Sequence, residues 1–228
     1  MRLGIVTGTR IEAACLAVAT AGGGASVACS GADAGRARDA ALRLIAEGCT
    51  ALASAGTAGG RDDALAPGAL VIAESVVALD GMGYATDERW RVALVERLSA
   101  GGLAVQVALV VGCDAAVHDV AGKRRLRQAT GAACCDMESH VVAAVAAASG
   151  VPFIAVRAIA DPAARALPRA ALVAAGPDGA LRLGALAAAL LARPGEIGDM
   201  VVLARASRKA MRSLRGVAAL GGPLLALA

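Results

Sequence analysis

Short apolar runs alternate with alanine-rich stretches along most of the chain, and this alternation constrains the fold more than any other feature. Runs with the length and composition of buried strands cover 3–7, 26–29, 51–54, 70–79, 106–111 and 153–159. Stretches of helical character cover 11–21, 35–47, 138–148 and 181–191. Alternating strands and helices indicate a mostly parallel sheet with helices on both faces. We therefore predict a single α/β domain with a twisted, mostly parallel sheet.

The composition indicates a core made of small and aliphatic side chains. Hydrophobic residues make up 57% of the 228 residues, so the chain can bury a sizeable core and is not a disordered protein. Its only aromatic residues are Tyr84, Trp90 and Phe153. The formal net charge of +4 is modest, which argues against nucleic acid as a partner.

The six cysteines form no CxxC pair, and no histidine stands at ligand spacing from them, so we predict no metal site. The first ten residues lack the features of a signal peptide. The longest apolar stretch, 141–156, is interrupted by Ser149, Gly150 and Pro152, so it is not expected to span a membrane. We therefore expect reduced thiols in a cytoplasmic protein.

Residues 196–228 differ from the preceding 1–195, which we assign to the α/β domain. Four of their cations share one helical face: Arg205, Arg208, Lys209 and Arg212. A basic amphipathic helix is typical of membrane-surface segments, which suggests contact of 199–228 with the inner face of a membrane. The alternative is a helix packed on the domain with a solvated cationic face. The apolar tail 224–228 is expected either to be disordered or to touch a membrane.

Three carboxylates stand at strand ends or helix starts, which is where open α/β sheets bind ligands. Glu12 follows the first strand, Glu138 opens an alanine-rich helix, and Asp161 ends the strand 153–159. Each taken alone could be a solvated side chain, and a helix dipole alone explains an acid at a helix start. Their joint placement indicates a ligand site without naming a reaction.

The glycine-rich segment 55–60 is predicted to be a loop that follows a strand, where a ligand can approach the backbone closely. It matches neither the dinucleotide-binding GxGxxG pattern in context nor a P-loop. His118 and His140 are the only histidines, and a lone histidine is more often structural than catalytic. No serine stands in a GxSxG motif, so a serine hydrolase is not expected.

Three segments together resemble the superfamily of purine nucleoside phosphorylases and methylthioadenosine nucleosidases. They are 4–8 running into Glu12, 55–60 with 67–71 behind it, and 136–139 followed by 151–161. The resemblance covers about residues 1–192 and is closest to the hopanoid-associated phosphorylase branch. It implies a three-layer α/β/α fold with a central mixed, mostly parallel sheet. It also implies a homo-oligomer that needs no metal and no organic cofactor.

The resemblance assigns a role to each of five residues. Asp161 matches the aspartate that protonates N7 of the departing purine, and Glu138 matches the carboxylate that holds the ribose hydroxyls. Met137 matches the residue that lies along the sugar. Glu12 matches the base that activates the attacking water, and Thr57 matches the hydroxyl residue near that nucleophile. A proton-donating carboxyl is expected to have a raised pKa.

Departures from the family pattern bear on the nucleophile. Phosphorylases carry a phosphate-binding arginine where this chain has Ser54, so its absence favours water as the nucleophile. Arg10 lies in the first turn beside Gly8, which we assign to substrate binding. Because Arg10 could bind phosphate, phosphate as a co-substrate stays open.

Further departures bear on the base. Ala116, which is followed by Val117, stands where the nucleosidases have a phenylalanine that stacks on the purine. Stacking contributes about 1 kcal/mol, so the base must be held by other contacts or bound more weakly. Ala160 replaces the serine that precedes the aspartate in relatives, which removes one hydrogen bond from Asp161.

These observations predict an enzyme that releases adenine from a 5′-substituted adenosine, with adenosylhopane as the expected lipid substrate and ribosylhopane as the product. The alternatives are phosphorolysis of the same substrate, or a methylthioadenosine/adenosylhomocysteine nucleosidase. A nucleoside-binding protein without turnover is a further alternative, but binding alone would not need all three carboxylates.

Overall fold

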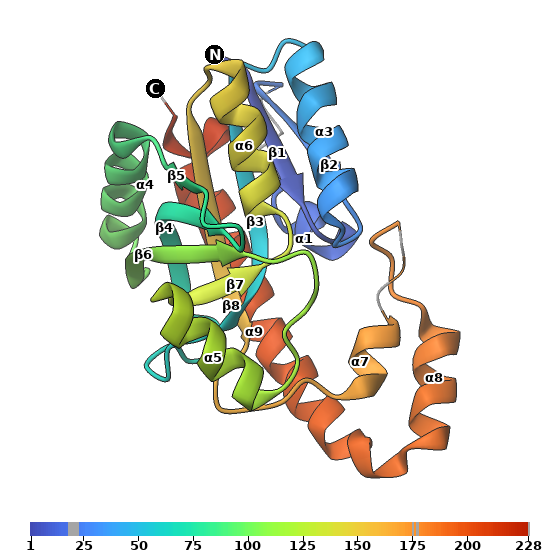
Figure 1. The fold of residues 1–228 in the computed structure, drawn as a ribbon. Coiled ribbons are helices and arrows are strands. Elements are labelled where there is room, and N and C mark those ends of the chain that lie inside the picture. The colour runs from blue at the N-terminus through green and yellow to red at the C-terminus, as the bar shows by residue number, and fades with distance from the viewer. Residues whose placement is uncertain (18–22, 175, 177, 228) are drawn as a thin grey trace.

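The computed structural model describes residues 1–17, 23–174, 176 and 178–227, and it is a three-layer α/β/α fold (Figure 1). The strands are β1 (Leu3–Thr7), β2 (Ala25–Cys29), β3 (Ala51–Gly60), β4 (Leu70–Ala78), β5 (Gly83–Ala85), β6 (Val105–Gly112), β7 (Cys134–Asp136) and β8 (Phe153–Asp161). The longer helices are α3 (Ala34–Ala46), α4 (Glu88–Ala100), α5 (Val120–Thr130), α6 (Ser139–Ser149), α8 (Leu183–Ala192) and α9 (Ile197–Gly221). The short helices are α1 (Arg10–Cys15) and α7 (Arg169–Ala174), with 3-10 turns at Pro194–Glu196 and Pro223–Ala226.

The sheet is mixed, as the family resemblance implies. Its strand order is β2-β1-β3-β7-β6-β4-β5, and β8 pairs with both β3 and β4. The pairings β1–β2, β1–β3, β3–β8, β4–β6 and β6–β7 are parallel, whereas β3–β7, β4–β5 and β4–β8 are antiparallel. Because β1, β3 and β8 run parallel, their carboxyl ends meet at one edge of the sheet.

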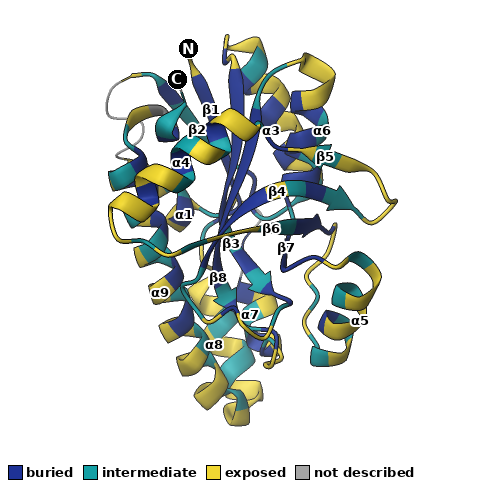
Figure 2. Cartoon of the chain, turned by 90° about the vertical axis from the view of Figure 1, so that its left-hand side faces the viewer, coloured by how far each residue is buried: buried dark blue, intermediate teal, exposed yellow. Residues whose placement is uncertain are grey.

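Alternating side chains of the central strands fill two separate core layers. In β1, Leu3 and Ile5 pack on the side of α4 and α9, whereas Val6 packs on the side of α3 and α6. β8 follows the same rule, with Ile154 in the first layer and Ala155 in the second. This two-residue period is the one that a strand buried on both faces requires. Figure 2 shows the strands as the most deeply buried part of the molecule.

The C-terminal helix α9 packs against the sheet and contributes side chains to this core. Its buried residues recur at helical spacing, at Ala206, Ala210, Leu214, Val217, Ala218 and Gly221, while its cations stay exposed. The apolar face that we considered for membrane contact is therefore packed on the domain. The expectation of a disordered or membrane-bound tail is wrong for Leu225, which is buried and accepts a 2.8 Å hydrogen bond from the Trp90 indole.

Two further expectations need correction. The glycine-rich segment 55–60 is not a loop but the second half of β3, in register with β8 and with a bulge between Ala58 and Gly59. The helix expected over 11–21 is described as α1 up to Cys15, and positions 18–21 lie outside the described residues. No helix among the described residues combines the length and apolar character needed to cross a membrane.

Candidate active site

A cavity of about 230 Å³ lies at the edge where β1, β3 and β8 end. Its lining includes eight of the nine residues expected from the sequence, from segments far apart in the chain: Gly8, Glu12, Thr57, Ala116, Val117, Met137, Glu138 and Asp161. Arg10 is the exception. Its guanidinium lies outside the lining and forms an exposed 2.7 Å ion pair with Asp178. The structure therefore gathers the three carboxylates in one site and places Arg10 elsewhere.

Glu12 is fixed by a capping box at the start of α1. Thr9 caps the helix, and its backbone N–H donates a 2.8 Å hydrogen bond to Oε2 of Glu12. The second oxygen, Oε1, accepts hydrogen bonds of 2.7 Å from both the backbone N–H and the Oγ1 hydroxyl of Thr57. Three hydrogen bonds thus orient a buried carboxylate between the first helix and the middle of β3.

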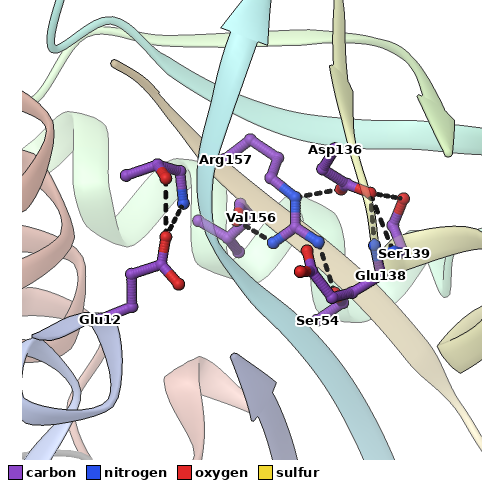
Figure 3. A network of polar contacts seen from close by, with 8 residues as sticks. Glu12, Ser54, Asp136, Glu138, Ser139, Val156 and Arg157 are labelled. Atoms are coloured by element: carbon purple, nitrogen blue, oxygen red, sulfur yellow. Dashed lines mark hydrogen bonds and ion pairs between the residues drawn. The ribbon is translucent and has the colours of Figure 1, made fainter. Parts of the chain in front are cut away.

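A buried ion pair lies behind Glu138 (Figure 3). The guanidinium of Arg157 binds Asp136 through Nε, the Val156 carbonyl through Nη1 at 3.0 Å, and the Ser54 hydroxyl through Nη2. The other oxygen of Asp136 accepts hydrogen bonds from the backbone N–H of Glu138 and from the N–H and hydroxyl of Ser139. This network fixes the turn that carries Glu138.

The same network explains the role of Ser54, the position where phosphorylases carry arginine. A guanidinium contacts the Ser54 hydroxyl, but it belongs to Arg157 on the neighbouring strand β8. All three of its nitrogens are engaged by protein oxygens, and Arg157 is not part of the cavity lining. Arg157 is therefore a structural cation, and its guanidinium is not available to bind a phosphate.

Glu138 is buried and belongs to the cavity wall. Burial raises its pKa to about 8, with further increases from the Asp136 and Glu12 carboxylates, and Arg157 opposes them. The raised pKa favours the protonated form of Glu138 at neutral pH. A protonated carboxyl can both donate and accept hydrogen bonds, which suits it to a pair of sugar hydroxyls.

Asp161 lies at the end of β8 beside the fully buried Lys123 of α5. The Lys123 Nζ is 2.5 Å from Oδ2 of Asp161. Burial raises the pKa of Asp161, while Lys123, and more weakly Arg61, act in the opposite direction. The raised pKa agrees with the expectation for a proton-donating carboxyl.

Glycines in the first turn and in β3 make room for all three carboxylates. A Cβ on Gly8 would lie 2.8 Å from Oε1 of Glu138, and one on Gly56 would lie 3.1 Å from Cδ of Glu12. A Cβ on Gly59 would lie 3.2 Å from Oδ2 of Asp161. Gly56 therefore leaves room for Glu12, and Gly59 leaves room for Asp161 and for the Arg61 guanidinium, whose Nη1 would lie 2.9 Å from a Cβ there.

Sequence reasoning missed the cations that surround these carboxylates. Arg157 carried a visible signal, because a charge inside the apolar strand 153–161 must find a buried partner. The sequence around Lys123 and Arg61 gave no such signal. Arg61 lines the cavity near Asp161 and donates to the Gly60 carbonyl and the Cys135 sulfur.

The arrangement separates two chemical functions. At one end, Glu12 with Thr57 offers a proton acceptor; at the other, Asp161 with Lys123 offers a proton donor. Glu138 and Met137 also line the cavity. Among the described residues, no group of three or more His, Cys, Asp or Glu side chains is arranged to hold a metal ion.

Comparison with known proteins identifies the family and the fold. The family model described as the phosphorylase superfamily matches residues 8–193. A search of curated proteins gave no match. The fold is similar to 5′-methylthioadenosine/S-adenosylhomocysteine nucleosidase from Helicobacter pylori, solved with butyl-thio-DADMe-Immucillin-A (17% identity, TM-score 0.73, covering 96% of this chain and 97% of that one).

Two further solved structures show the same fold. Futalosine hydrolase from Helicobacter pylori is 17% identical, with a TM-score of 0.69 and coverage of 95% of this chain and 96% of that one. The 5′-methylthioadenosine/S-adenosylhomocysteine nucleosidase from Campylobacter jejuni is 18% identical, with a TM-score of 0.69 and coverage of 96% and 100%.

Proposed function

Because the chain belongs to the phosphorylase superfamily, we propose that it cleaves the N-glycosidic bond of a purine nucleoside with water as the nucleophile. The observation that carries this proposal is the Glu12–Thr57 pair on the cavity wall. The cation among the described lining residues, Arg61, lies near Asp161, at the opposite end. A water molecule beside Glu12 would meet a proton acceptor there, whereas a phosphate would meet a carboxylate without a neighbouring cation.

The three carboxylates divide the reaction between them. As the C1′–N9 bond breaks, its electron pair passes to the purine, and Asp161 donates a proton to N7. The ribosyl group becomes an oxocarbenium-like cation, which water attacks at C1′ while Glu12 accepts the proton of that water. Glu138 holds the ribose hydroxyls, and Met137 lies along the sugar. The products are the free base and the ribose with a hydroxyl at C1′.

We propose a 5′-substituted adenosine as the substrate, with adenosylhopane as the candidate and ribosylhopane as the product. The support is an apolar surface beside the cavity, whose wall includes Leu167 and Leu203. Exposed apolar side chains also lie on α7, α8 and the start of α9: Leu172, Val173, Leu183, Leu191, Ile197 and Val201. Figure 2 shows α8 and the adjoining part of α9 as largely exposed.

This apolar surface suits a lipid substituent on C5′ because such a group needs an open groove rather than a closed pocket. The exposed cations of α9 would favour an anionic membrane surface nearby. The same surface could instead be covered by a second copy of the chain, as expected for a homo-oligomer. A short 5′ group, as in methylthioadenosine, or no 5′ substituent would make no contact with this apolar surface.

The test is release of free adenine from adenosylhopane in detergent, with and without phosphate, and with methylthioadenosine in parallel. Release without phosphate supports hydrolysis, and release only with phosphate would establish phosphorolysis. Activity on methylthioadenosine alone would overturn the lipid substrate. Asp161→Asn should abolish turnover while ligand affinity is nearly kept, and Asp63→Asn, at an exposed position, is the matched control.

A further inference from the structure

Lys123 is a fully buried cation whose ammonium is bound by oxygens of one short segment, 161–165. Its Nζ lies 2.5 Å from Oδ2 of Asp161, 3.0 Å from the Pro162 carbonyl and 2.6 Å from the Arg165 carbonyl. An ammonium has three hydrogens, so these three oxygens use its full donor capacity. The side chain of Lys123 is 1% exposed and that of Asp161 is 10% exposed. Lys123 therefore reaches the cavity only through Asp161.

Burying a lysine is costly unless its charge is paired, so a lysine at this position needs a compensating function or partner. Asp161 lines the cavity, and among the described residues none donates a hydrogen bond to its second oxygen, Oδ1. That oxygen is free to contact a ligand. The pair thus joins a carboxyl that can touch the substrate to a buried amine that borders an adjoining surface hollow on its other side.

We propose that Lys123 is the positioning residue of Asp161: it orients the carboxylate toward the cavity and supplies the proton that Asp161 passes to the departing base. This inference rests on the proposed function. An ammonium proton moves to the Asp161 carboxylate, and the carboxyl proton moves to N7 as the C1′–N9 bond breaks. Lys123 is left as a neutral amine, Asp161 as a carboxylate and the base as its protonated form. A proton from solvent then restores the ammonium.

Other groups around the pair support a shared proton. Burial lowers the pKa of Lys123, Asp161 opposes this, and Arg61 lowers it further. Burial raises the pKa of Asp161. The two values therefore approach each other, which eases proton exchange between the partners. The remaining neighbours are Cys135, which borders the cavity, and the charged side chains of the adjoining surface hollow: Asp62, Asp63, Arg124 and Arg127.

The test compares the pH dependence of kcat and KM in the parent, Lys123→Met and Arg124→Met. Methionine keeps the length of the buried side chain without its charge, and Arg124 is an exposed cation on the same helix. In Lys123→Met, Asp161 must take its proton from solvent, so activity is lost as pH rises through the pKa of Asp161. We expect kcat to fall about 30-fold at pH 8 and much less at pH 5.5, with KM within about threefold.

Two further measurements separate the two roles of Lys123, which are to orient Asp161 and to supply its proton. Lys123→Arg keeps the charge, but a guanidinium does not release its proton, so kcat at pH 8 should stay as low as in Lys123→Met. Carboxyl ¹³C NMR, with Asp161 assigned through Asp161→Asn, follows its titration without turnover. In Lys123→Met that titration should move to higher pH.

The outcomes are distinct. A Lys123→Met profile that follows the parent and Arg124→Met overturns the inference, as does full recovery of kcat in Lys123→Arg. If the parent releases no base from any nucleoside at any pH, the proposed function fails, while the NMR titration still reports whether Lys123 holds the Asp161 proton. Thermal unfolding of each variant identifies losses that come from misfolding.

Discussion

Replacing Glu138 by glutamine should stabilise the protein, and the gain should grow with pH. The Glu138 pKa is raised from 4.5 to about 8 by burial and by the neighbouring carboxylates. In the unfolded chain the same carboxyl ionises near its ordinary value. Between these values the folded protein binds one proton that the unfolded chain has released, so the free energy of unfolding falls as pH rises through this window. Above about pH 8 the carboxyl is ionised in both states, so the stability difference between the variant and the parent no longer grows.

The magnitude follows from the shift. One pKa unit corresponds to about 1.4 kcal/mol, so three pH units between about 5 and 8 correspond to up to about 4 kcal/mol. Glutamine has the same shape and never ionises. The Glu138→Gln variant should therefore match the parent near pH 5 and exceed its stability by up to about 4 kcal/mol at pH 8.

Equilibrium urea unfolding of both proteins at the two pH values measures this difference. Ionisable groups elsewhere in the chain are present in both proteins, so their contributions cancel in the difference. Glu96→Gln, on the exposed face of α4, is the matched control and should show a constant difference from the parent. If the difference between Glu138→Gln and the parent is the same at both pH values, the assignment of a protonated, buried Glu138 is refuted.

Three further predictions concern the site and its support. Thr57→Val removes the hydroxyl that donates to Glu12 and should lower kcat about tenfold with KM nearly unchanged, measured by steady-state kinetics. Arg157→Met leaves the Asp136 carboxylate buried without its cation and should cost about 3–5 kcal/mol of unfolding free energy in urea; a loss under 1 kcal/mol would contradict the buried pair. Arg10→Ala should leave base release unchanged with and without phosphate, because its exposed ion pair lies outside the cavity; a selective loss with phosphate would restore Arg10 as an anion-binding group.

The parts of the fold that the sequence predicted are those governed by local patterning. The strand at 3–7 and the strand at 153–161 are apolar on both faces, so their composition alone marks them as buried. Glu12, Glu138 and Asp161 could be found because each stands near a strand end or a helix start. Their gathering in one cavity follows from the parallel direction of β1, β3 and β8.

The missed features depend on contacts between distant segments. Glycine weakens an isolated strand, so 55–60 was expected to be a loop; in the structure β8 pairs with it, and Glu12 and Asp161 occupy the space beside it. Lys123 lies among the charged residues of α5 and has no local mark that separates it from its exposed neighbour Arg124. Its ammonium is bound by carbonyl oxygens of the segment that follows Asp161, which lies far from it in the sequence.

The position of α9 has a consequence for how the chain folds. This last helix covers the face of the sheet to which the first strand contributes Leu3 and Ile5, and Leu225 completes the same layer. Contacts between the first and last segments span nearly the full chain length, and such contacts slow folding. During synthesis, α4 can cover its part of that face early, but the part that α9 covers stays exposed until α9 has left the ribosome.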